Sequence, residues 1–324
     1  MNSTPRRARL RALAKINLDL RVLGLRADGY HEIRTIFHTI SLADRIEVEY
    51  TPARRTSIEV DCSPPIADNL VERAARMTLE AMGTDARVRF RLDKRIPMGA
   101  GLGGGSSDAA AVLLALPVLA RRRLTMVTLH GLAARLGSDV PFFLLGGAAV
   151  GLGRGEELYP LPSLAPLPGV LVCPEIEVST AEAYRWLNRT RLTKPVEFNM
   201  MDSFQALAWC LASSTPQPVG NRGWGAFCRN DFEEVVFRNY PRLKLLRGKL
   251  RKLGAEPVLM SGSGSSLFGI FTRTADVQRA CLAMGRERVF PFRLVSRERY
   301  RSMWWRNLRE HGNGKQWPPP DQRG

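Results

Sequence analysis

Residues 97–110 read PMGAGLGGGSSDAA, and five of them are glycine. The stretch follows a strand-like run, VRFRL (88–92), and leads into SSDAAAVLLAL (106–116), which predicts a helix capped by Ser106 or Ser107. Without side chains, successive backbone N–H groups can wrap an anion, and the N-terminus of the following helix adds positive potential. The loop therefore predicts a site for the phosphates of a nucleoside triphosphate; the alternative is a purely structural glycine-rich loop.

This loop differs from two widespread phosphate-binding loops. No lysine follows its last glycine, and the pattern GxxxxGK[ST] occurs nowhere in the chain. The spacing GxGxxG of dinucleotide-binding loops can be found within it, but residues 115–130 contain none of the acidic residues that such a site requires further along. The charged partners of the loop must therefore come from other segments.

A strand near the N-terminus carries polar side chains that can serve this purpose. Apolar and polar residues alternate strictly over 14–22, which predicts a half-buried strand with Lys15, Asn17, Asp19 and Arg21 on its polar face. Because side chains two residues apart on a strand share a face, Lys15 and Asn17 can line one cleft.

The remaining patterns predict a mixed α+β protein of two domains. The proline-rich stretch 160–168 indicates a connector. We therefore expect an N-terminal domain over 1–160, a C-terminal domain over 161–296 and a basic tail over 297–324, whose last residues cannot bury enough apolar area to become ordered. Within the tail, Trp304 and Trp305 are expected to dock on the protein's own core or on a partner. Further strand-like runs cover 33–40 and 45–50, and helical patterns cover 69–82, 125–137, 180–188, 203–212 and 241–254.

Composition narrows the possible classes of protein. With 44% hydrophobic and 24% charged residues, the chain of 324 residues has the usage of a soluble globular protein. It has no apolar run long enough to span a membrane and no secretory cleavage site, so we expect a cytoplasmic protein. The five cysteines form no CxxC pair, which disfavours zinc and a disulfide framework. The net charge of +17 is dispersed along the chain and indicates a solvated surface rather than a specific nucleic-acid site.

The glycine-rich loop matches P-x-G-x-G-L-G-S/G-S-S, the signature of the GHMP kinases, which are named for galactokinase, homoserine, mevalonate and phosphomevalonate kinases. Two further motifs of that family are AKINLDL (14–20) and SGSGSS (261–266). The chain resembles this family from about residue 12 to about residue 295.

The resemblance implies an N-terminal domain similar to the second domain of ribosomal protein S5, a ferredoxin-like C-terminal domain and an active site between them. It also implies ATP and Mg²⁺ as cofactors, with no readable ligands for the metal. The residues implied in ATP binding are Pro97, Met98, Gly99, Ala100, Gly101, Leu102, Gly103, Gly104, Gly105, Ser106 and Ser107.

The same resemblance implies that Asp139 is the general base and Lys15 the cation beside it. Phosphoryl transfer requires an aligned acceptor hydroxyl and a group that receives its proton. Asp139 lies in a turn between Gly137 and Pro141, a typical place for a functional carboxylate. Without the resemblance it would be interpreted as a turn or capping residue.

Substrate specificity is indicated by RADGYHEI (26–33), which places Tyr30 and His31 after an Asp-Gly turn. An aromatic ring beside an imidazole suits a pyrimidine base. RADGYHEIRTIF (26–37) and LGSDVPFFL (136–144) narrow the resemblance to members that phosphorylate the 2-hydroxyl of a cytidine-diphosphate-linked polyol in the non-mevalonate route to isoprenoid precursors. It implies that Tyr30 and His31 hold the cytosine, that Tyr184 closes the other side of the base, and that Asn17 also contacts the substrate.

Several alternatives stay open. The substrate can instead be that of another GHMP kinase, such as homoserine or a mevalonate derivative. The charge of +17 also suggests a nucleic-acid-binding protein built on an S5-like domain, although no basic stretch is interleaved with aromatic residues near the motifs. SGSGSS (261–266) is either a second phosphate-facing loop or a tight hairpin turn. We expect a monomer or weak homodimer whose partner is a small molecule, without membrane association.

Overall fold

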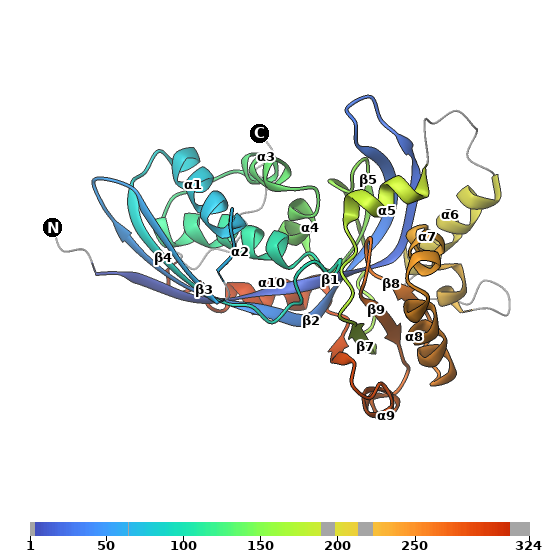
Figure 1. Cartoon of the computed structure of the whole chain (residues 1–324). Coiled ribbons are helices and arrows are strands. Elements are labelled where there is room, and N and C mark those ends of the chain that lie inside the picture. Colours follow the sequence, from blue (N-terminus) through green and yellow to red (C-terminus); the bar gives the residue numbers. More distant parts are fainter. Residues whose placement is uncertain (1–3, 64, 189–197, 213–222, 312–324) are drawn as a thin grey trace.

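The computed structural model describes residues 4–63, 65–188, 198–212 and 223–311 (Figure 1). Its elements alternate between strands and helices along the chain, as the mixed α+β prediction requires. In chain order they are β1 (Arg6–Leu25), β2 (His31–Pro52), β3 (Ser57–Ser63), α1 (Leu70–Met82), β4 (Ala86–Asp93), α2 (Gly104–Ala120), α3 (Met126–Leu136), α4 (Val140–Leu145), β5 (Ala148–Leu152), β6 (Glu157–Leu161), β7 (Pro168–Cys173), α5 (Thr180–Leu187), α6 (Phe198–Ala212), a 3₁₀ turn (Trp224–Phe227), α7 (Phe232–Asn239), α8 (Pro241–Lys252), β8 (Val258–Met260), β9 (Leu267–Ile270), α9 (Thr274–Ala283), β10 (Arg288–Arg293) and α10 (Arg297–Trp305).

The N-terminal half is built on a six-stranded sheet in the order β3-β4-β2-β5-β6, with β1 paired to β2. Strands β1 and β2 run antiparallel along nearly their whole length. Helices α1 to α4 lie on one side of this sheet in Figure 1. The C-terminal half has a four-stranded antiparallel sheet in the order β10-β7-β9-β8, accompanied by α7, α8 and α9.

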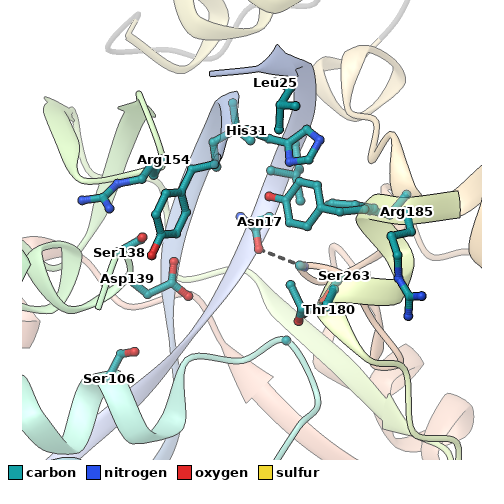
Figure 2. A pocket seen from close by; sticks show the side chains of 18 of the residues that line it. Asn17, Leu25, His31, Ser106, Ser138, Asp139, Arg154, Thr180, Arg185 and Ser263 are labelled. Carbon is teal, nitrogen blue, oxygen red and sulfur yellow. Dashed lines mark hydrogen bonds between the residues drawn. The ribbon is translucent and has the colours of Figure 1, made fainter. Parts of the chain in front are cut away.

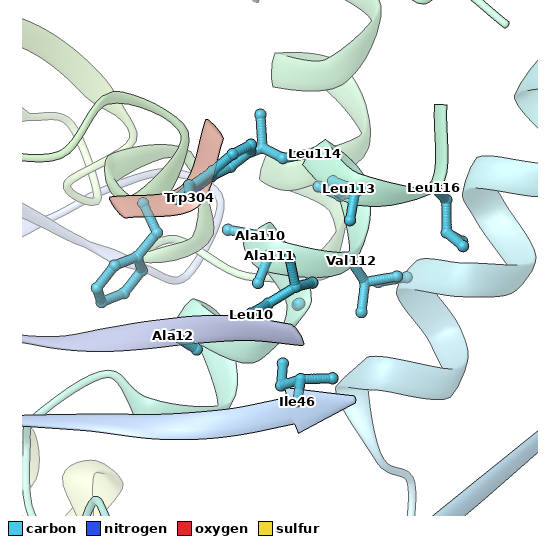
Figure 3. Close-up of a cluster of buried hydrophobic side chains, with 14 of the residues drawn as sticks. Leu10, Ala12, Ile46, Ala110, Ala111, Val112, Leu113, Leu114, Leu116 and Trp304 are labelled. Atoms are coloured by element: carbon cyan, nitrogen blue, oxygen red, sulfur yellow. The ribbon is translucent and has the colours of Figure 1, made fainter. Parts of the chain in front are cut away.

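Helix α2, which follows the glycine-rich loop, is the centre of the N-terminal core. All its residues from Ser107 to Leu119 are buried, because it lies between the sheet and the neighbouring helices. Figure 3 shows its apolar side chains above Leu10 and Ala12 of β1 and Ile46 of β2. Fully burying one such leucine or valine contributes about 1.5–3 kcal/mol, so this packing anchors the helix and fixes where the loop before it must lie.

Strand β1 belongs to both halves. Beyond the first sheet it meets the segment before α7, where the Leu20 amide donates to the Arg229 carbonyl at 2.8 Å and the Asp231 amide donates to the Leu20 carbonyl at 2.9 Å. The prediction that β1 is half-buried is wrong. Lys15 and Asn17, on its polar face, are only 3% and 2% exposed, because the C-terminal half covers that face.

Helix α10 packs back on the N-terminal core. Tyr300, Trp304 and Leu308 are buried in the same cluster as α2, so Trp304 docks on the protein's own core, one of the two expected positions. Residues 312–324, where the frayed end is predicted, lie outside the described residues. Among the helices that the structure does describe, none combines the length and the apolar character that crossing a membrane requires.

Candidate active site

A cavity of about 920 Å³ lies between the two halves of the molecule. It is bounded by β1, the glycine-rich loop, the start of α4, the start of α5 and the 261–266 loop (Figure 2). The sequence-predicted residues outside the glycine-rich loop all line it: Lys15, Asn17, Tyr30, His31, Asp139 and Tyr184. From the glycine-rich loop and the first turn of α2, Gly101 and Ser106 reach the cavity.

The predicted cation and general base are adjacent. The Lys15 Nζ lies 3.3 Å from the Asp139 Oδ2, with the lysine side chain 4% exposed and the aspartate side chain 33% exposed. Asp139 occupies the N-cap position of α4, but its side chain makes no capping hydrogen bond. The carboxylate is therefore free to face the cavity.

Asn17 connects this pair to the C-terminal half. Its Oδ1 accepts hydrogen bonds from the Lys15 Nζ at 2.8 Å and from the Gly262 amide at 2.9 Å. Its Nδ2 donates to the Thr35 Oγ1 at 2.8 Å. The sequence analysis missed Thr35, because nothing in the pattern of β2 distinguishes it from an ordinary buried strand threonine.

The glycine-rich loop is held in a shape that only glycine adopts without strain. Gly101 and Gly103 have φ of +73° and +68°. A Cβ at Gly101 would lie 2.1 Å from the Ser261 carbonyl oxygen, and one at Gly103 would lie 2.9 Å from the Phe143 ring. The backbone therefore comes very close both to the C-terminal half and to α4.

The predicted serine cap of α2 is wrong. The helix begins two residues earlier, at Gly104, with Gly103 at the N-cap position and no side-chain capping bond. Ser106 and Ser107 consequently fall in the first turn, where Ser106 faces the cavity and Ser107 is 1% exposed. Backbone N–H groups at such a helix start lack intrahelical partners, so this end of α2 can bind an anion.

The 261–266 loop is a hairpin connection, one of its two predicted roles, and its contact with phosphates stays a prediction. It joins β8 to β9 as a tight connection, and Gly262 and Ser263 also line the cavity. The Ser261 Oγ donates to the Gly101 carbonyl at 2.9 Å, which ties this loop to the glycine-rich loop.

The aromatic residues gather at the far end of the cavity. The rings of His31 and Tyr184 stack on each other, with centroids 4.4 Å apart and an angle of 20° between planes. No third ring fits between these two. Tyr30 is 54% exposed, and the Arg154 guanidinium lies 4.7 Å from the centre of its ring. Figure 2 shows Arg154 and His31 on opposite sides of the cavity.

Burial shifts the pKa values of the two stacked side chains. It lowers the pKa of His31, which favours a neutral imidazole able both to donate and to accept a hydrogen bond. Burial, with a smaller effect of the Asp139 charge, raises the pKa of Tyr184 to about 12, so its hydroxyl stays protonated. The pair therefore presents an uncharged polar edge to the cavity.

Two arginines that the sequence analysis missed also line the cavity. Arg154 lies between Gly153 and Gly155 and is held by Glu156, which accepts from its Nε at 3.2 Å and from its backbone N–H at 2.7 Å. Arg185 follows Tyr184 on α5. Together with Lys15 they make the cavity suited to an anionic ligand. The ranges that the structure describes contain no group of three or more His, Cys, Asp or Glu residues able to hold a metal ion.

Comparisons with known proteins agree with this geometry. Residues 69–147 match the GHMP kinases N terminal domain, and residues 221–289 match the GHMP kinases C terminal domain. The chain is 54% identical to the 4-diphosphocytidyl-2-C-methyl-D-erythritol kinase of Solibacter usitatus over 98% of both chains. It is 44% identical to the enzyme of that name from Thermus thermophilus over 84% of this chain and 91% of the relative.

A crystal structure of 4-(cytidine 5'-diphospho)-2C-methyl-D-erythritol kinase is also similar. It superposes with a TM-score of 0.71 and 40% sequence identity, covering 90% of this chain and 99% of the other. The predicted fold class, a two-domain GHMP kinase of α+β type, is thereby confirmed. On the identity to these relatives over nearly its whole length, the chain belongs to the 4-diphosphocytidyl-2-C-methyl-D-erythritol kinases, a branch of the GHMP kinase family.

Proposed function

We propose that this chain transfers the γ-phosphoryl group of ATP to the 2-hydroxyl of 4-diphosphocytidyl-2-C-methyl-D-erythritol, giving the 2-phosphate and ADP. The reaction belongs to the non-mevalonate route to isoprenoid precursors. The observation that carries the proposal is the Lys15–Asp139 pair, 3.3 Å apart, in one cavity with a glycine-rich loop. The names of the relatives support the choice of substrate.

The nucleotide end of the cavity is the glycine-rich loop with the start of α2. Its left-handed glycines and uncapped first helical turn present bare backbone N–H groups, which suit the oxygens of a triphosphate. Bound Mg²⁺ would neutralise charge on the phosphates. Such an ion is commonly held by phosphates and one or two protein oxygens, and the Ser106 hydroxyl and the Asp139 carboxylate are oxygen donors that line the cavity.

At the acceptor end, Asp139 receives the proton of the substrate hydroxyl. The hydroxyl oxygen forms a bond to the γ-phosphorus while the bond from that phosphorus to the β–γ bridging oxygen breaks, and ADP leaves. Lys15 orients the carboxylate and stabilises negative charge on the transferring group. Its burial makes that electrostatic contribution larger than it would be in water.

The cytidine diphosphate end is assigned to the aromatic residues and the arginines. A cytosine stacked on Tyr30 would present its polar edge to His31, with Tyr184 behind the histidine rather than against the base. Arg154 and Arg185 supply positive charge for the diphosphate.

The test is a substrate panel. The purified chain is incubated with ATP, Mg²⁺ and either the cytidylated alcohol, methylerythritol phosphate, mevalonate or homoserine, and products are identified by mass spectrometry. We expect one added phosphate on the cytidylated alcohol alone. Faster turnover of an uncytidylated alcohol would instead support one of the other GHMP kinase activities.

A further inference from the structure

A residue that does not line the cavity helps to fix the orientation of the Asn17 amide. Thr35, on β2, is fully buried, and its hydroxyl makes two hydrogen bonds. It donates to the Asp19 carbonyl at 2.7 Å and accepts from the Asn17 Nδ2 at 2.8 Å. We propose that Thr35 is a positioning residue for phosphoryl transfer, acting on Lys15 through Asn17.

Counting donors and acceptors gives the reason. A threonine hydroxyl has one proton, and the Asp19 carbonyl can only accept. The proton of Thr35 is therefore used on Asp19, and toward Asn17 the hydroxyl can only accept, so the amide nitrogen must face it. The Asn17 oxygen is then turned toward the two donors on its other side, the Lys15 ammonium and the Gly262 amide.

The opposite orientation of the amide is unfavourable at three places at once. With Nδ2 turned toward Lys15, an N–H group would face the ammonium and the Gly262 N–H, and both would lose the Asn17 oxygen as an acceptor. The Asn17 oxygen would in turn face the Thr35 oxygen, whose one proton is already donated to Asp19. Leaving the hydrogen bonds of buried groups unmade destabilises that orientation. Thr35 thus holds, from the nitrogen side of the amide, the arrangement in which one oxygen binds both the catalytic cation and the C-terminal loop. Figure 2 shows Asn17 between Asp139 on one wall and Ser263 on the other.

The same count limits what Asn17 can do for the substrate. Both lone pairs of its oxygen are occupied and one of its two N–H groups is used by Thr35. One N–H donor is left, so the predicted substrate contact of Asn17 reduces to a single donated hydrogen bond. Its main role is to hold Lys15 and the 261–266 loop in place.

The proposal rests on the kinase function proposed above, and turnover of the wild-type protein tests that function separately. Thr35→Val removes the hydroxyl at nearly constant volume, whereas Thr35→Ser keeps it. We expect T35V to lower kcat by about 10- to 100-fold, with the KM for ATP within about threefold of wild type, because misplacing a catalytic group by about 1 Å has effects of this size. T35S should stay within about threefold of wild type.

A matched control is Thr78→Val on α1. Thr78 is also fully buried, and its hydroxyl donates within the helix to the Ala74 carbonyl, far from the cavity. T78V should leave kcat unchanged. If T35V does not fold, T35S and T35A make the same comparison, since both lack the methyl group and only serine retains the hydroxyl.

A double-mutant cycle separates positioning from packing. In an N17A background, T35V should change kcat by less than about twofold, because Thr35 has nothing left to orient. Equal losses from T35V in both backgrounds, or equal kcat for T35V and wild type, would overturn the proposal. A crystal structure of T35V gives a readout independent of turnover: the Asn17 side chain should shift away from its wild-type position beside the Lys15 Nζ, and an unchanged Asn17 side chain would contradict the assignment.

Discussion

Lys15 is buried, whereas Asp139 is partly open to the cavity. This difference in exposure gives the two residues different roles. A buried ammonium must keep its partners, whereas the carboxylate needs access to a hydroxyl. Lys15 therefore serves as the fixed member, held by Asn17 and by the Phe37 ring 5.3 Å from its Nζ. Asp139 is the member that meets the substrate.

Asp139→Asn keeps the shape of the side chain and removes its basicity. Loss of a positioned general base lowers rates by about 10²- to 10⁴-fold, so kcat should fall by that amount while ATP binding persists. Steady-state kinetics and calorimetric titration with ATP measure the two quantities. Wild-type turnover in D139N would refute the role of Asp139 as the base.

Arg154→Met retains most of the length of the side chain and removes the charge beside Tyr30. A cation–π contact of this kind contributes about 0.5–2 kcal/mol. We expect the KM for the cytidylated substrate to rise about tenfold with kcat nearly unchanged, the pattern of lost uniform binding. Arg89→Met, on the outer face of the sheet where Arg89 pairs with Glu59, is the control and should alter neither constant. An unchanged KM in R154M would exclude Arg154 from substrate binding.

At the scale of single residues, the sequence predicted which side chains meet in the cavity but not how they are held. Lys15, Asp139 and Tyr30 stand in recognisable motifs. Thr35 falls within RADGYHEIRTIF (26–37), but that motif does not indicate its proposed role, which depends on a hydroxyl meeting a carbonyl across two strands. The stacking of His31 on Tyr184 depends on a contact between β2 and α5 that no local pattern contains.

Among the elements, α4 is six residues long and begins directly after Asp139, so its position relies on its neighbours. Helix α10 is one of these. The Tyr300 hydroxyl donates to the Phe143 carbonyl at 2.5 Å, and the Arg297 guanidinium donates to the carbonyl of Gly146 at 3.2 Å. The C-terminal helix thus secures the helix that carries the proposed base.

Trp304→Ala should destabilise the fold strongly. Trp304 is 7% exposed and packs in the main N-terminal core, and truncating a buried aromatic residue costs about 3–5 kcal/mol. Trp305 is only partly buried, so W305A should cost less than half as much. Denaturant unfolding followed by circular dichroism measures both. Equal losses would show that α10 is not anchored through Trp304.

The elements themselves were largely predictable, because most have strong periodicity. The helix predicted over 125–137 is observed as α3, and the one predicted over 241–254 as α8. The start of α2 could not be predicted from the sequence. Glycines 104 and 105 adopt helical geometry only because the loop before them packs against Ser261 and Phe143. Tertiary contact overrode the capping preference of serine there.

On the scale of the whole molecule, stability should depend on pH through His38, which β1 and β5 flank. Burial lowers the pKa of His38 to about 4, against about 6.5 in an unfolded chain. Below pH 6.5 the unfolded state therefore binds more protons, and the stability that neutral His38 provides is lost as pH falls toward 4. The loss is about 3 kcal/mol in total.

Comparison with His38→Asn isolates this effect, because carboxylates that titrate alike in both proteins cancel. The free energy of unfolding is measured from pH 7 to pH 4. The advantage of wild type over H38N should shrink by about 3 kcal/mol across that range, and parallel curves would contradict a neutral buried His38.

The dispersed charge of +17 predicts a surface of solvated charged side chains. The outer face of the N-terminal sheet is such a surface. There Arg7 pairs with Glu49 and Arg9 with Glu47 across neighbouring strands, with most of these side chains exposed. The sequence could not predict which half covers the polar face of β1. The alternation of apolar and polar residues is the same whether that face meets water or protein.

The three hydrophobic clusters share one strand. Leu10 of β1 packs in the first, Val22 in the second and Ile16 in the third, and the first also contains Leu308 beyond α10. During synthesis β1 is therefore made long before Leu308, its partner in the first cluster, has been translated. Neither half can complete its core early, so we expect the polypeptide to depend on protection from aggregation until synthesis has passed Leu308.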